Sequence, residues 1–154
     1  MIQRIQSIWL FLAAITLICL LVFPLMTKNV DNTEYHLYIN GLQQDATSVQ
    51  GIGGSAGFIV TVALNALSIL ICLLTIFLFK NRSLQKRLIG LIVILTLVVV
   101  VISGFNTQLL PGGPDGAKIK AGAFLPLIAI IFSMLALRGI RKDEQLLRSA
   151  DRLR

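Results

Sequence analysis

Residues 57–79, GFIVTVALNALSILICLLTIFLF, decide the fold class, because no charged side chain interrupts this apolar stretch. A helix needs about 20 such residues to cross about 30 Å of hydrocarbon. The chain has 154 residues, of which 56% are hydrophobic and only 14% are charged. Three more stretches resemble the first. We therefore predict an all-α membrane protein, a bundle of four transmembrane helices at about residues 6–26, 57–79, 88–105 and 121–138.

Basic residues fall unevenly between the predicted spans. With four spans, the N-terminus, the link at 80–87 and the segment from Arg138 to the C-terminus lie on one side of the membrane. Together they hold 11 of the 14 Lys and Arg residues. Segments rich in Lys and Arg face the cytoplasm. We therefore expect a multi-pass protein of the bacterial inner membrane with both termini in the cytoplasm, and small loops on the outer face.

One outer loop has a local pattern of its own. Residues 35–39, YHLYI, alternate in polarity and lead into Asn40-Gly41, which is typical of a β-hairpin turn. The returning arm, residues 42–49, is polar and has little strand character. The sequence therefore leaves open a short hairpin near Tyr35–Asn40 or an irregular loop.

Small and weakly polar residues recur at heptad spacing on two predicted helices. Helices in lipid associate where small side chains allow close backbone approach and polar groups bond across the interface. We expect these faces to close the protein's own bundle, to bind another membrane protein, or to line a lipid or substrate groove. The predicted packing and partner residues are Thr61, Asn65, Ser68, Cys72, Ala129, Ser133 and Ala136.

Residues that carry catalysis or ion transport are missing from the predicted spans. Ion pumps and proton-coupled carriers need ionisable groups at depth, and apart from Arg138 at the end of the fourth span, no Asp, Glu, Lys, Arg or His lies within a span. The single histidine, His36, falls in an outer loop. Cys19 and Cys72 are expected at different depths, which argues against a disulfide or a metal pair. We therefore expect no enzyme, no cofactor and no metal site.

The C-terminal segment, residues 139–154, is expected to continue the fourth helix as a basic tail, because it is rich in strong helix formers. It would contact anionic membrane lipid or dock to a cytoplasmic partner. The ribosome is the weaker partner, because the tail carries charges of both signs. The predicted docking residues are Arg82, Lys86, Arg87, Arg138, Arg141, Lys142, Arg148, Arg152 and Arg154.

The basic segments also carry a family resemblance. Residues 1–6 (MIQRIQ), 81–88 (NRSLQKRL), 137–144 (LRGIRKDE) and 149–154 (SADRLR) resemble a family of four-helix inner-membrane proteins of the Bacteroidota, a domain of unknown function. In topology the resemblance covers the whole chain. It supplies no catalytic residue, and it implies a partner on the cytoplasmic side or within the membrane.

The resulting hypothesis is a non-catalytic accessory or structural subunit of a larger inner-membrane assembly. Protein export or insertion machinery is the assembly we expect. The alternative is a small carrier or lipid-binding membrane protein with a groove lined by Thr61, Asn65 and Ser68. No specific small molecule is inferred.

Overall fold

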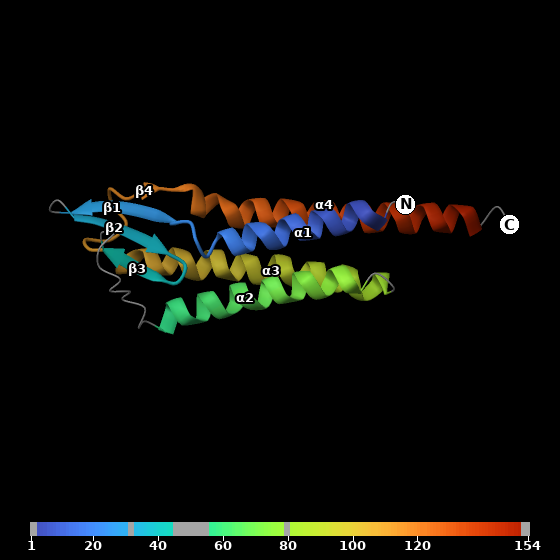
Figure 1. Ribbon diagram of the computed structural model, residues 1–154, viewed down its shortest axis with the longest axis horizontal. Helices are drawn as coiled ribbons and strands as arrows, with labels where there is room; N and C mark the ends of the chain where they lie inside the picture. The colour runs from blue at the N-terminus through green and yellow to red at the C-terminus, as the bar shows by residue number, and fades with distance from the viewer. Residues whose placement is uncertain (1–2, 31–32, 45–55, 79–80, 152–154) are drawn as a thin grey trace.

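The computed structural model describes residues 3–30, 33–44, 56–78 and 81–151, with side chains between Gln6 and Leu146. Figure 1 shows long helices side by side and a sheet at one end. The elements are α1 (Gln3–Cys19), β1 (Met26–Val30), β2 (Thr33–Tyr38), β3 (Gly41–Gln44), α2 (Ala56–Phe77), α3 (Arg82–Asn106), the 3₁₀ helix η1 (Thr107–Leu109), β4 (Lys118–Ile119), the 3₁₀ helix η2 (Ala121–Phe124) and α4 (Leu125–Asp151).

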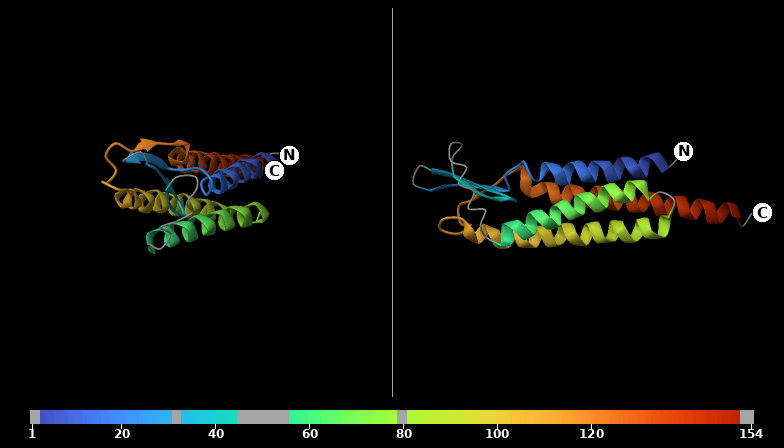
Figure 2. Two further views of the ribbon diagram at one scale, coloured as in Figure 1. Left: turned by 60° about the vertical axis from the view of Figure 1, so that its left-hand side comes forward. Right: turned by 60° about the horizontal axis from the view of Figure 1, so that its bottom comes forward.

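The four helices form an antiparallel ring. α1 packs against α2 and α4, and α3 packs against the same two neighbours. Figure 2 shows both chain termini at the end of the bundle opposite the sheet. We call this end the terminal end and the other the sheet end.

Each helix contributes one buried face whose residues recur at spacings of four and three, which is the pattern of a heptad seam. On α2 and α4 the seams contain the polar and small residues that the sequence singled out. The inward residues are Gln6, Leu10, Ala13 and Leu17 on α1; Phe58, Thr61, Asn65, Ser68, Cys72 and Thr75 on α2; Gln85, Ile89, Ile92, Thr96 and Val99 on α3; and Ala129, Ser133, Ala136, Ile140 and Asp143 on α4.

The sheet contradicts the prediction of an all-α bundle with small loops. Its four antiparallel strands lie in the order β3-β2-β1-β4. A hairpin does join β2 to β3, but Tyr38 pairs with Gly41, so Ile39 and Asn40 form the turn. The larger sheet was missed because β1 begins inside a predicted span and β4 is only two residues long.

The first predicted span, 6–26, is also wrong. α1 has 17 residues and is therefore about 26 Å long. It ends in a tight turn, in which the amides of Leu21 and Val22 donate to the carbonyls of Ile18 and Cys19. Pro24 then disfavours helical geometry at the residue before it. Three helical stretches, Ala56–Phe77, Arg82–Leu109 and Ala121–Leu146, are long and apolar enough to cross a membrane.

The fourth helix continues past residue 138, the end of the predicted span, into the tail that we expected to be helical. α4 continues to Asp151, so the expected helical tail is part of one helix. Its start lies later than predicted, because residues 121–124 form η2.

The outer surface of the bundle is strongly apolar. Large side chains such as Ile59, Leu70 and Phe77 are 62%, 55% and 75% exposed. Extended exposed apolar surface of this kind marks contact with a membrane or another protein. Together with the three long apolar helices, it indicates membrane association.

Candidate functional site at the terminal end

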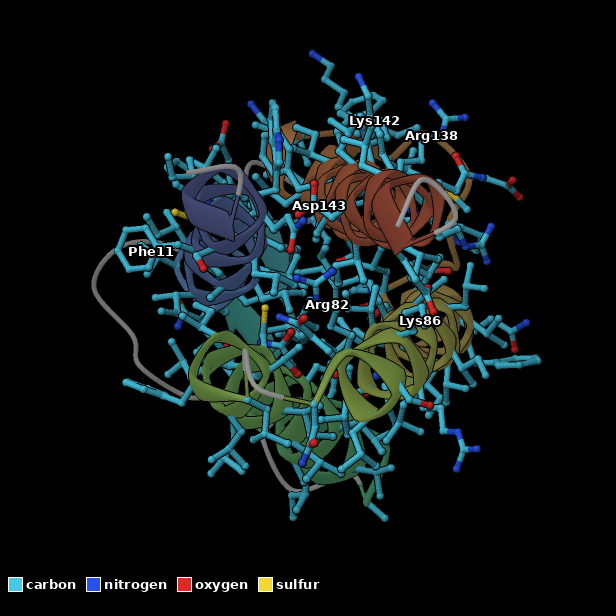
Figure 3. All side chains as sticks on the ribbon, turned by 90° about the vertical axis from the view of Figure 1, so that its right-hand side faces the viewer. Phe11, Arg82, Lys86, Arg138, Lys142 and Asp143 are labelled. Atoms are coloured by element: carbon cyan, nitrogen blue, oxygen red, sulfur yellow. The ribbon has the colours of Figure 1, made fainter. Side chains whose placement is uncertain are left out.

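Basic side chains surround the terminal end of the bundle, which Figure 3 views end-on. Arg87, Arg138, Arg141 and Lys142 are all exposed there. Figure 3 places Arg138 and Lys142 on the outer side of α4. These four predicted docking residues therefore form one accessible basic rim.

Asp143 lies on the opposite face of the same helix. It is only 8% exposed. It follows the buried residues Ala136 and Ile140 at the spacing of four and three that marks the inward face of α4. The Gln6 side-chain amide of α1 donates to Asp143 Oδ2. Asp143 Oδ1 is buried and has no hydrogen-bond partner.

A second charged group enters the bundle from α3. Arg82 is partly buried, and its Nη1 atom is buried without a hydrogen-bond partner. Figure 3 shows Arg82 and Asp143 directed toward the inside of the helix ring. Two groups of opposite charge therefore face the same interior, each with an unused hydrogen-bonding atom.

Two further contacts connect neighbouring helices around these groups. Lys86 Nζ on α3 lies 2.6 Å from Glu144 Oε2 on α4, and both side chains are about one-third exposed. Gln85 Nε2 donates to the backbone carbonyl of Thr75 at 3.2 Å and so ties the start of α3 to the end of α2. We call Gln6, Arg82, Gln85, Lys86, Asp143 and Glu144 the terminal cluster.

The terminal cluster is suited to binding. A buried polar atom without a partner costs about 1–3 kcal/mol, so native proteins contain few of them. The free atoms of Arg82 and Asp143 offer one donor and one acceptor in a site that three helices frame. Within the described residues, no group of three His, Cys, Asp or Glu side chains could hold a metal ion.

The predicted seam on α2 is used inside the bundle. Thr61, Asn65, Ser68 and Cys72 are all 0% exposed. Asn65 Nδ2 donates to the carbonyl of Leu17 at 3.0 Å. That carbonyl lies in the last turn of α1, where a helix leaves its carbonyls without partners in the chain.

The remaining polar contacts of the seams also lie within the bundle. Cys72 Sγ lies 3.1 Å from the Leu10 carbonyl of α1. The Ser68 and Ser133 hydroxyls donate to carbonyls four residues earlier in their own helices. Ala129 and Ala136 are buried on α4. The residues therefore serve as packing faces of this bundle, and a role in binding a partner through them stays a prediction.

Three predicted docking residues cannot be placed. Arg148 belongs to α4, but its side chain lies outside the described part of the structure. Arg152 and Arg154 lie outside the described residues altogether.

Sequence reasoning missed Gln6, Gln85 and Asp143. Gln85 and Asp143 were interpreted as parts of basic flanking segments, and Gln6 as the first residue of a predicted span. The signal that would have found them is the heptad spacing continued past the apolar stretch. Gln6 precedes Leu10 by four, Gln85 precedes Ile89 by four, and Asp143 follows Ile140 by three.

Comparison with known proteins gives a family without an assigned activity. No curated protein and no solved structure matches the chain. The family model described as a domain of unknown function (DUF4293) matches residues 2–153. Because the match covers nearly the whole sequence, the chain belongs to this family.

Proposed function

We propose that the protein is a non-catalytic accessory subunit of a larger assembly in the bacterial inner membrane, with its terminal end in the cytoplasm. The distribution of basic residues supports this orientation. Arg82, Arg87 and Arg138 lie at the terminal end, whereas the sheet end carries only three lysines, Lys28, Lys118 and Lys120. An excess of Lys and Arg marks the cytoplasmic side.

The observation that carries the proposal is the length of α4. Both Figure 1 and Figure 2 show its C-terminal part extending past the ends of the other three helices. A helix end without neighbouring helices gains nothing from packing within its own chain. A projecting helical segment of this kind is suited to docking in a groove of a partner.

The exposed residues at the base of this projecting segment define the partner surface. Arg141 and Lys142 are exposed, and Leu146 is 51% exposed. A partner would therefore present an acidic surface beside an apolar patch. Protein export or insertion machinery is the inner-membrane assembly that we would test first.

The alternative function, a carrier, requires a groove other than the one predicted along Thr61, Asn65 and Ser68. Thr61, Asn65 and Ser68 are sealed between helices. A ligand would have to separate the bundle to reach them. Their burial favours the accessory-subunit function over a carrier that uses this seam.

The test is affinity purification of the tagged full-length protein in mild detergent. The wild type would be compared with a chain truncated after Leu146. This truncation removes residues 147–154, the outer part of the projecting segment, and keeps Asp143 and Glu144, whereas an earlier cut would also disrupt the terminal cluster. A stoichiometric membrane complex that the truncation weakens supports the proposal and identifies the partner.

Charge-neutralising variants distinguish a loss of docking from a loss of folding. Arg141→Gln combined with Lys142→Gln should weaken the same complex, because both side chains are exposed. Lys118→Gln combined with Lys120→Gln, at the sheet end, is the matched control and should leave it intact. Recovery of the wild type alone, or only with copies of itself, would contradict the proposal.

A further inference from the structure

A lateral pocket lies at the sheet end of the bundle and encloses about 170 Å³. α3 contributes Val100, Ser103 and Gly104, and the start of α4 contributes Pro126 from the facing side. The lining is almost wholly apolar. A protein cavity of about 150 Å³ accommodates a benzene ring, so this pocket has room for about six carbons of an acyl chain.

Gly104 keeps the pocket open. A Cβ atom built at this position would meet no atom within 4 Å. Glycine within a helix is unfavourable relative to alanine, and no close contact at this position requires it. Because Gly104 lines the pocket, a larger side chain at this position would have room to occupy part of it.

The mouth of the pocket faces the surroundings of the bundle. Phe105 and Phe124, which neighbour its lining residues in the chain, are 66% and 55% exposed. In the membrane arrangement proposed above, on which this inference rests, lipid chains surround these side chains. The accessible apolar ligand at the mouth is therefore a lipid.

The backbone of two exposed lysines lies beside residues that line the pocket. The amide of Ala123, a lining residue, donates to the carbonyl of Lys120 at 3.1 Å. Lys118 pairs with Thr27 across β4 and β1, next to the lining residue Met26. Both lysines are exposed. Their ammonium groups are complementary to a phosphate at the membrane surface.

We propose that this pocket binds one acyl chain of an anionic phospholipid, whose phosphate is held by Lys118 and Lys120. The apolar cavity selects a lipid chain, and the lysines select the charge of the headgroup. The site is separate from the terminal cluster, which lies at the other end of the bundle.

The test is native mass spectrometry of the full-length protein in mild detergent. Phosphatidylglycerol and phosphatidylcholine with identical chains would be titrated separately. We expect one phosphatidylglycerol to bind with about 25-fold higher affinity than phosphatidylcholine, because each of the two lysines contributes a factor of about five. Gly104→Leu should weaken phosphatidylglycerol binding about tenfold, which corresponds to the loss of roughly two buried methylenes.

Gly90→Leu is the matched control. It lies on the same helix, and a Cβ atom there also meets nothing within 4 Å. It should retain the wild-type lipid affinity. Lys118→Gln combined with Lys120→Gln should reduce phosphatidylglycerol binding to the level of phosphatidylcholine, with binding of the latter unchanged.

A measurement on the wild type does not depend on the folding of any variant. A phosphatidylglycerol with a photoreactive tail should label mainly residues 100–107 and 123–126. Labelling spread over the outer faces of all helices, or equal affinity of Gly104→Leu and wild type, would overturn the proposal. The purification experiment reports on the terminal end, so loss of the lipid site and loss of the accessory function give different results.

Discussion

The two ends of the bundle are closed by different kinds of contact. At the sheet end, backbone groups bond to backbone groups: the Leu25 amide donates to the Leu37 carbonyl at 2.7 Å, and the Lys120 amide donates to the Leu25 carbonyl at 3.0 Å. At the terminal end, side chains connect the helices. Gln6 donates to Asp143, and Lys86 pairs with Glu144.

This difference separates an end that is held by backbone contacts from the end where we propose that a partner protein binds. Backbone contacts fix a geometry with few alternatives, because any displacement breaks several bonds together. Side-chain contacts across helices can exchange partners, and two charged groups at the terminal end have buried atoms without a partner. We therefore expect substitutions to cost most stability at the sheet end and to change binding at the terminal end.

The largest effect is expected for Gly122→Ala. A Cβ atom at Gly122 would lie 2.4 Å from the backbone carbonyl oxygen of Pro24, and a backbone atom cannot move aside cheaply. We expect a loss of about 3 kcal/mol in the free energy of unfolding, the upper range for overpacking. Unfolding in detergent, followed by circular dichroism, measures it.

Gly90→Ala is the control for this substitution. No atom lies within 4 Å of a Cβ at Gly90, so alanine there should stabilise the helix by up to about 1 kcal/mol. A Gly122→Ala variant as stable as the wild type would show that the close approach of Gly122 to Pro24 does not hold the sheet end together.

The next largest loss of stability is expected at the contact between Gln6 and Asp143. Asp143→Ala leaves the buried Gln6 amide without its acceptor, and Gln6→Ala leaves the carboxylate without its donor. Each should cost about 2 kcal/mol, because a buried polar group loses its partner. The double variant should cost less than the sum, with a coupling of about 1–2 kcal/mol.

A double-mutant cycle of Gln6→Ala and Ser68→Ala is the matched control. The Ser68 hydroxyl bonds to the Leu64 carbonyl of its own helix, so these two effects should add within about 0.5 kcal/mol. An additive result for Gln6 and Asp143 as well would mean that their contact does not join α1 to α4.

A smaller effect is expected for Asn65→Leu, in the middle of the bundle. The Leu17 carbonyl would lose its donor from α2, which should cost about 0.6–1.7 kcal/mol, the range for polar contacts between membrane helices. Ser68→Ala on the same face should cost less, because the Leu64 carbonyl keeps its helical backbone bond. Equal losses at both positions would contradict a specific role of Asn65 at the end of α1.

Local and long-range contacts also differ in how well they could be predicted from the sequence. The heptad spacing of Thr61, Asn65 and Ser68 identified a packing face, because periodicity along one helix is a local property. The sheet was missed because its pairing joins Met26 to Ile119 across most of the chain. The terminal cluster was predicted only in part. Arg82 and Lys86 were expected docking residues, whereas Asp143 was missed because it stands among exposed charges and only the register of α4 turns it inward.

The smallest effect is expected for Lys86→Met. Both partners of the Lys86–Glu144 pair are about one-third exposed, and exposed ion pairs contribute about 0–1 kcal/mol. We expect a loss of about 0.5 kcal/mol at low salt, and no difference from wild type near 1 M salt, where charges are screened within about 3 Å. Unfolding in detergent at both salt concentrations measures this. A loss above about 2 kcal/mol that persisted in high salt would mean that the pair is shielded from water. The terminal end would then be closed as firmly as the sheet end, and the contrast between them would fail.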